Sequence, residues 1–189
     1  MINKHRLALA SKSPRRLQLL NGVGLDVIVV PSRVEPNLER NGSGAEQALG
    51  SALAKLPTIT QEFLTLSADT VVHLRHECFG KPNSADEAIV MLNKLSGRAH
   101  HVTTGVAIRH AQGVHSFSVT STVHFRHLRA AEIEHYVASG EPMDKAGAYG
   151  IQGLGAGLIE RVEGSHTAVV GLPLSETLKA LHELGVRRQ

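Results

Sequence analysis

The chain has 189 residues, of which 42% are hydrophobic, and its formal net charge is +3. A chain of this length can bury a sizeable core, so we expect residues 1–189 to form a single domain with room for two lobes. The basic residues are scattered, and only four Phe and two Tyr are available to stack on bases. These features argue against a nucleic-acid surface and leave room for a small polyanionic ligand.

The cysteine and histidine patterns indicate no zinc site. The single cysteine, Cys78, excludes an intramolecular disulfide framework and a cysteine-rich zinc site. The twelve histidines show no His-Glu-x-x-His spacing, and most of those near residues 100–127 are expected to be surface or half-buried residues.

The cysteine count and the distribution of apolar residues also predict the cellular compartment of the protein. One unpaired cysteine fits a reducing cytosol. The N-terminal residues are polar, and no apolar run approaches the length that crosses a bilayer. We therefore expect a soluble cytoplasmic protein with no membrane partner.

The first elements of the chain are a short strand followed directly by a helix. Residues 8–10 are an apolar run typical of a strand, Ser11 is a helix-capping type, and Pro14 suits the first position of a helix. Such a helix N-terminus attracts anions through its free backbone N–H groups, and Arg15 and Arg16 add two cations. The segment fits a phosphate site and, equally, a capped helix with solvated arginines.

Further along the chain, hydrophobic spacing and start and stop residues predict a mixture of hairpins and helices. The expected strands are 26–30, 64–72, 158–162 and 169–170, with a long hairpin over 100–125 that turns at 111–113. The expected helices are 14–22, 43–56, 84–97, 130–139 and 173–185, of which the second and third start with capping boxes. Residues 32–42 and 144–157 are expected loops. This mixture favours an α/β fold with a mixed sheet over a regular βαβ series.

A carboxylate and a hydroxyl, Asp69 and Thr70, interrupt the apolar strand over 64–72. Adjacent strand residues point to opposite faces, so at least one of the two faces away from a simple core. Asp69 either caps a turn at the strand end or lies where ligands collect in α/β folds. In the second case it can hold a divalent metal or accept a proton from water.

Two turn-like segments carry further candidate ligand groups. Lys81 lies between Gly80 and Pro82. It is either a solvated lysine or, on a loop made rigid by the proline, a positive charge held beside a phosphate. Residues 140–153 combine glycines with Asp, Lys, Tyr and Gln side chains, so the backbone can approach a ligand closely. The glycine spacing excludes a dinucleotide fingerprint, and no glycine-rich loop ends in Gly-Lys-Ser/Thr, which excludes a P-loop.

Six segments, in this order, resemble the Maf (septum-formation-like) nucleotide pyrophosphatases over essentially the whole chain. They are residues 9–16, 68–72, 80–82, 95–97, 144–153 and 169–174. The resemblance implies a mixed twisted α/β sheet with flanking helices and two lobes around a central cleft, like that of inosine triphosphate pyrophosphatases. It also implies hydrolysis of a nucleoside triphosphate to the monophosphate and pyrophosphate, with Mg²⁺ or Mn²⁺ as cofactor and a homodimer as the expected assembly.

The resemblance also implies roles for individual residues. Asp69 would be the proton acceptor and a metal ligand. Phosphate would be held by Ser11, Arg15, Arg16, Lys55 and Lys81. Arg15, Thr70 and Gln152 match the positions that separate the dTTP/UTP-type subgroup from the methylated-GTP-type subgroup. The expected substrates are therefore dTTP, UTP and modified pyrimidine nucleotides.

The loop after the second expected strand departs from the family pattern. The family usually has an acidic pair there, whereas this chain has Glu35 followed by Pro36. Glu35 is therefore the expected second metal ligand, and Glu39 is the alternative.

A different class of function also fits the resemblance. The chain could be a regulatory nucleotide-binding protein that acts in cell division, or septum formation, through partners. The intact Asp69 and both arginines favour the enzyme, because a protein that only binds nucleotides needs no base.

Overall fold

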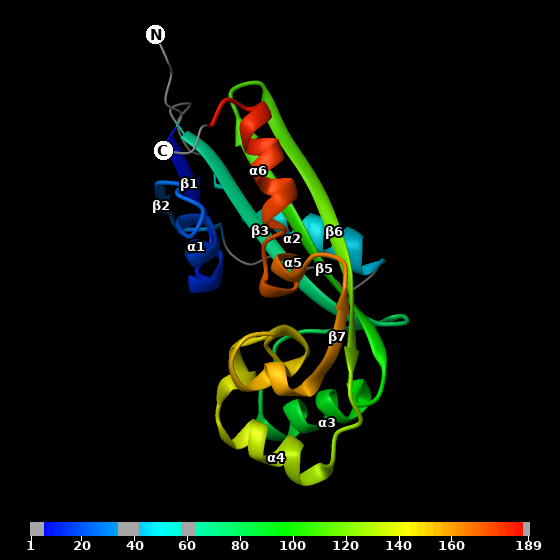
Figure 1. Ribbon diagram of the computed structural model, residues 1–189. Helices are drawn as coiled ribbons and strands as arrows, with labels where there is room; N and C mark the ends of the chain where they lie inside the picture. Colours follow the sequence, from blue (N-terminus) through cyan, green and yellow to red (C-terminus); the bar gives the residue numbers. More distant parts are fainter. Residues whose placement is uncertain (1–5, 34–41, 58–62, 187–189) are drawn as a thin grey trace.

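The computed structural model describes residues 6–33, 42–57 and 63–186. Within these ranges, a seven-stranded mixed sheet runs through the molecule, and helices cover both of its faces (Figure 1). The strand order is β2-β1-β3-β5-β6-β7, and β4 pairs with β3 outside this path. β1 is parallel to β2 and to β3, whereas the other strand pairs are antiparallel. The predicted mixed sheet with flanking helices is confirmed.

The strands are short at one edge and long in the centre. They are β1 (Arg6–Leu9), β2 (Val27–Val29), β3 (Phe63–Leu74), β4 (Glu77–Phe79), β5 (Ala99–His110), β6 (Gly113–Phe125) and β7 (Ile159–Glu163). The α-helices are α1 (Pro14–Asn21), α2 (Gly44–Lys55), α3 (Ala85–Leu95), α4 (Ala130–Ala138), α5 (His166–Val170) and α6 (Leu174–Glu183). Three 3₁₀ turns are η1 (Glu141–Asp144), η2 (Ala146–Ala148) and η3 (Gly153–Leu158). None of the helices in the described ranges has the length and apolar composition needed to cross a membrane.

Side-chain caps explain where α2 and α3 begin. The Ser43 hydroxyl accepts the N–H of Glu46, whose carboxylate accepts the N–H of Ser43, as the predicted capping box requires. At α3, the Ser84 hydroxyl accepts the N–H of Glu87. Helices α2 and α3 therefore begin close to their predicted first residues.

Three local predictions differ from the structure. Residues 169–170 were predicted as a strand, but they end α5, because the Ser165 hydroxyl caps the N–H of Ala168 and starts a helical turn. Strand β4 was not predicted; it forms after a turn at Arg75, whose φ is 55°. The predicted loop over 144–157 contains η2 and η3.

In the described residues, the sheet supports two large hydrophobic cores and a small cluster of Ala52, Leu56 and Ala107 under α2. One core packs α1 and α6 against one end of the sheet and includes Leu66 and Ile108. The other packs α3 and α4 against the far end of the β5–β6 hairpin and includes Leu92 and Phe125. The long strands extend through both regions (Figure 1), so the two predicted lobes share one sheet. The first lobe is the region of α1 and α6, and the second lobe is the region of α3 and α4.

Helix α2 covers the face of the sheet opposite α5 and α6, and it lies very close to β5. A Cβ at Gly105 would be 2.4 Å from the carbonyl oxygen of Ala48, so only glycine permits this approach. Gly105 pairs with Asp69 of β3, and Lys55 lies in the last turn of α2. The close packing therefore brings Lys55 near Asp69.

His100 is an exception to the expected exposure of the hairpin histidines, because its side chain is only 1% exposed. Its Nε2 lies 2.8 Å from the hydroxyl of Tyr149, and its ring packs edge-on against Tyr149 and Phe125. Burial lowers the pKa of His100 to about 4, so the buried ring is neutral at physiological pH.

We expect the free energy of unfolding of the wild type to fall more steeply on acidification than that of the His100→Gln variant. An unfolded histidine has a pKa near 6.5, whereas the folded pKa of His100 is about 4. As the pH falls through this window, the unfolded state therefore takes up the proton first, and stability decreases. Thermal denaturation from about pH 7 to about pH 4 should give a smaller pH dependence of Tm for the variant. Equal pH dependences would contradict this account.

Candidate active site

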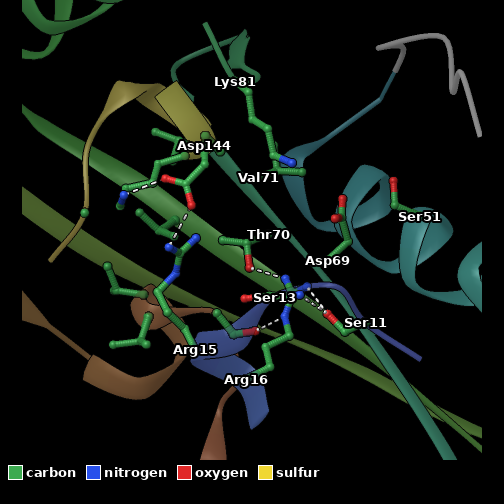
Figure 2. A pocket seen from close by; sticks show the side chains of 18 of the residues that line it. Ser11, Ser13, Arg15, Arg16, Ser51, Asp69, Thr70, Val71, Lys81 and Asp144 are labelled. Carbon is green, nitrogen blue, oxygen red and sulfur yellow. Dashed lines mark hydrogen bonds and ion pairs between the residues drawn. The ribbon is translucent and has the colours of Figure 1, made fainter. Parts of the chain in front are cut away.

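A cavity of about 590 Å³ opens between the two lobes. The β1–α1 loop and the end of α2 form one side, and the β4–α3 loop and the segment after α4 form the other. Every predicted site residue within the described ranges lines this cavity. These residues are Ser11, Arg15, Arg16, Lys55, Asp69, Thr70, Lys81 and Gln152. Figure 2 shows several of them directed towards one another.

The cavity lies where the outer edge of β3 is open. That edge pairs with β1 over 63–66 and with β4 over 72–74. Within the described ranges, no strand pairs there with the residues in between, which include Asp69 and Thr70. Both faces of β3 can therefore be reached from one cavity, so two adjacent residues with opposite orientations both line it.

Asp69 lies on the α2 side of β3 and forms an ion pair with Lys55. Lys55 Nζ donates to Asp69 Oδ1 at 2.7 Å, and the two side chains are 12% and 23% exposed, respectively. The Ser67 hydroxyl donates to the carbonyl of Ala52 at 2.6 Å and holds the end of α2 against β3. A carboxylate able to accept a proton and an ammonium group able to attract phosphate thus lie side by side.

On the other face of β3, Thr70 belongs to a hydrogen-bond network around Arg16, which is 9% exposed. The Arg16 guanidinium donates to the carbonyl of Gly171 at 2.7 Å. It also donates to Ser11 Oγ at 3.1 Å and to Thr70 Oγ1 at 3.2 Å (Figure 2). Thr70 Oγ1 is in turn 2.8 Å from Thr104 Oγ1. Arg16 therefore joins the β1–α1 loop, β3 and the α5–α6 connection.

Arg15 extends towards the second lobe and forms an ion pair with Asp144 (Figure 2). Arg15 Nη1 donates to Asp144 Oδ2 at 3.1 Å, and Lys145 Nζ donates to Asp144 Oδ1 at 2.6 Å. Burial alone would raise the pKa of Asp144, but Lys145 and Arg15 lower it overall. The sequence of residues 140–153 marked Asp144 and Lys145 as charged groups that a ligand could contact. No sequence signal paired Asp144 with Arg15.

Lys81 and Gln152 reach the cavity from the second lobe. The N–H of Gly147 donates to the carbonyl of Gly80 at 3.0 Å and ties the loop of Lys81 to η2. Figure 2 shows Lys81 extending towards the same space as Asp69. Gln152 is the residue before η3, and its side chain is exposed at the cavity.

The described residues contain one of the two predicted metal ligands. Asp69 lines the cavity, whereas Glu35 lies outside the described residues, as do Pro36 and Glu39. In the described part of the chain, no group of three or more His, Cys, Asp or Glu residues could hold a metal ion. A metal in this cavity would therefore depend on further ligands, such as the oxygens of a phosphate.

Comparisons with known proteins agree with the motifs. The sequence profile of the Maf family, described as Maf-like protein, matches residues 6–184. The dTTP/UTP pyrophosphatase of Bacillus velezensis is 43% identical over 189 residues, which cover 96% of this chain and 98% of the relative. The dTTP/UTP pyrophosphatase of Anaeromyxobacter sp. is 46% identical over 185 residues, covering 95% and 90%. The structure of the Staphylococcus aureus Ham1 protein aligns with 17% identity and a TM-score of 0.48, covering 94% of this chain and 97% of that one.

Both the profile match and these identities extend over almost the entire chain. They include all six segments on which the resemblance was based. Five of the six segments, all but residues 95–97, contribute residues to the cavity, which brings together the predicted site residues from both lobes. The chain therefore belongs to the Maf family.

Proposed function

We propose that this protein hydrolyses dTTP, UTP and modified pyrimidine nucleotides to the monophosphate and pyrophosphate. The observation that carries the proposal is the meeting of the Asp69 carboxylate with several cationic side chains in a single cavity, which Asp144 also lines. These cations include Arg15, Arg16, Lys55 and Lys81. The choice of substrate is supported by the relatives named dTTP/UTP pyrophosphatase, at 43% and 46% identity.

The proposed reaction is attack of water on the α-phosphorus, with pyrophosphate as the leaving group. Asp69 accepts the proton from the water. Negative charge grows on the phosphate oxygens during the attack, and Arg16, Lys55 and Lys81 neutralise it from fixed positions. Ser11 Oγ accepts hydrogen bonds from Arg16 and from the backbone N–H two residues on, so its own proton is available to a phosphate oxygen.

Base selection in this proposal depends on contacts from Arg15 and Gln152. A guanidinium and an amide provide donors and an acceptor that match O4 and N3–H of uracil or thymine, and they match a purine amine poorly. The Thr70 hydroxyl is already bonded to Arg16 and Thr104. We therefore assign to Thr70 the role of fixing Arg16 rather than of touching the base.

The residues of the cavity fit a divalent cation that is held partly by the substrate. Mg²⁺ commonly binds through one or two carboxylates together with phosphate oxygens, and Asp69 supplies one carboxylate at the cavity wall. The proposed protein ligands are Asp69 and Glu35. When bound, the cation neutralises phosphate charge and makes the attacking water more acidic.

Glu35→Gln is expected to raise the metal concentration that gives half-maximal activity by at least about tenfold. The apparent KM for dTTP should change far less, because Glu35 contacts the cation rather than the nucleotide. Glu39→Gln should have little effect on the metal requirement, and a raised requirement in this variant instead would identify Glu39 as the ligand. Titrations of Mg²⁺ and Mn²⁺ at saturating dTTP measure both variants. An unaltered requirement in both would mean that this loop binds no metal.

The substrate assignment is tested by assaying pyrophosphate release from dTTP, UTP, dCTP, dATP and dGTP with Mg²⁺ or Mn²⁺. We expect the highest kcat/KM for dTTP and UTP. If no triphosphate yields pyrophosphate with either metal, the proposed activity is wrong and the regulatory nucleotide-binding protein becomes the better account.

The predicted homodimer and cytoplasmic location are separate parts of the proposal. Size-exclusion chromatography with light scattering tests the dimer, and a purely monomeric protein would contradict it.

A further inference from the structure

The carboxylate of Glu141 contacts the backbone of residues 150–155, the segment that carries Gln152. Glu141 begins η1, and its Oε2 accepts the N–H of Leu154 at 2.9 Å. Its Oε1 accepts the N–H of Gly155 at 3.0 Å and the hydroxyl of Tyr136 at 3.0 Å. One carboxylate therefore binds two backbone donors of the segment and a side-chain donor from α4.

The other end of the same segment is connected to Glu141 through Tyr136. Tyr136 is buried, and its hydroxyl oxygen accepts the N–H of Gly150 at 3.2 Å. Residues on both sides of Gln152 are thus linked to Glu141, directly at Gly155 and through one hydroxyl at Gly150. The backbone that carries Gln152 is therefore held at one end by Glu141 and at the other by Tyr136, and these two side chains are hydrogen-bonded to each other.

In this network, Glu141 is ionised and Tyr136 keeps its proton. Burial raises the pKa of Tyr136, and the negative charge of Glu141 raises it further, so the hydroxyl keeps its proton. Burial opposes ionisation of Glu141, but the N–H groups of Gly155 and Leu154 and the Tyr136 hydroxyl lower its pKa overall. The ionised carboxylate only accepts, and the Tyr136 hydroxyl donates to it.

The segment also folds too tightly to admit side chains at two of its glycines. Gly153 has a φ of +68°, and a Cβ there would be 2.6 Å from Glu141 Oε2. A Cβ at Gly155 would be 2.2 Å from the carbonyl oxygen of Gly150. The backbone therefore wraps closely around the carboxylate and has little freedom while the hydrogen bonds are made.

We infer that Glu141 is a positioning residue for base selection, which holds segment 150–155 so that Gln152 meets the nucleobase in one fixed place. The inference rests on the proposed function, because it takes Gln152 as a group that contacts the base. A glutamine amide pairs with uracil or thymine in one orientation and with cytosine after a flip. Discrimination between these bases therefore depends on where the backbone places the amide relative to the base.

The variant Glu141→Gln tests this role. It replaces one acceptor oxygen with an NH₂ group, which leaves a donor of the segment without its partner. We expect the ratio of kcat/KM for dTTP to that for dCTP to fall about tenfold. A higher KM for dTTP should account for most of this change, with kcat altered by less than about threefold.

Tyr136→Phe provides a second and milder test. This variant keeps the aromatic volume in the core and removes only the link between Glu141 and Gly150. The dTTP/dCTP ratio should change in the same direction by a smaller factor. Because little packing is lost, this variant decides the question should Glu141→Gln fail to fold.

The matched control is Glu132→Gln in α4 of the same lobe. The Glu132 carboxylate accepts from Arg126 Nη2 at 2.8 Å and from the N–H of Arg129 at 3.0 Å. This variant should lower Tm without changing the dTTP/dCTP ratio. The inference is overturned if Glu141→Gln or, should that fail to fold, Tyr136→Phe keeps the wild-type ratio. It is also overturned if Glu132→Gln changes the ratio equally.

The wild-type protein separates a failure of this inference from a failure of the proposed function. A wild-type preference for dTTP over dCTP that survives in the variants overturns only the role of Glu141. A wild-type protein with no such preference overturns the proposed selection of dTTP and UTP, and the inference falls with it.

Discussion

Asp69→Asn is expected to lower kcat for dTTP by about 10²–10⁴-fold, the usual contribution of a positioned general base. Asparagine has the shape of aspartate, but it accepts no proton from water and carries no charge for a metal. Its amide oxygen can still accept from Lys55 Nζ, which lies 2.7 Å from Asp69 Oδ1. The cavity wall should therefore keep its shape, with Tm and nucleotide affinity close to those of the wild type.

The control for this experiment is Asp86→Asn, which makes the same chemical change in the first turn of α3, away from the residues that line the cavity. Asp86→Asn should keep the wild-type kcat. Steady-state kinetics and thermal denaturation of both variants give the result. Activity of Asp69→Asn within about tenfold of the wild type would remove Asp69 from the mechanism.

Arg16→Met is expected to impair both folding and nucleotide binding. The Gly171 carbonyl loses the buried donor at 2.7 Å, which should lower the free energy of unfolding by about 1–3 kcal/mol. Loss of a charged hydrogen bond to phosphate should raise KM for dTTP about 10–100-fold. Urea denaturation and steady-state kinetics measure the two effects separately.

Arg15→Met is the matched comparison, because Arg15 is the neighbouring residue with the same side chain. Its ion pair with Asp144 is partly exposed, at 26% and 62% of the two side chains. Such a pair contributes at most about 1 kcal/mol to stability. Arg15→Met should therefore raise KM with little loss of stability. Equal destabilisation by the two variants would contradict the structural role assigned to Arg16.

Much of the local structure could be predicted from the sequence because its signals lie within a few residues. The capping residues Ser43 and Glu46 mark the start of α2, and β-branched residues mark the long hairpin. The prediction was wrong at residues 169–170, where two adjacent valines favour a strand on propensity alone. There the hydrogen bond from the Ala168 N–H to the Ser165 hydroxyl prevails.

The site was predictable residue by residue, but its grouping depends on the tertiary fold. Ser11 and Asp69 lie in the same cavity because β1 and β3 are parallel neighbours, with α2 between them in the chain. The motifs taken singly marked both positions, and only the family resemblance implied that both act on one substrate. The Arg15–Asp144 pair joins residues 129 positions apart on different lobes, so no local pattern could predict it.

The most direct test of the proposed mechanism is hydrolysis of dTTP by the wild-type protein in ¹⁸O-labelled water, with the products analysed by mass spectrometry. Attack on the α-phosphorus predicts dTMP that carries one ¹⁸O atom and pyrophosphate that carries none. Pyrophosphate that carries the label, or dTDP and phosphate as products, would contradict the account.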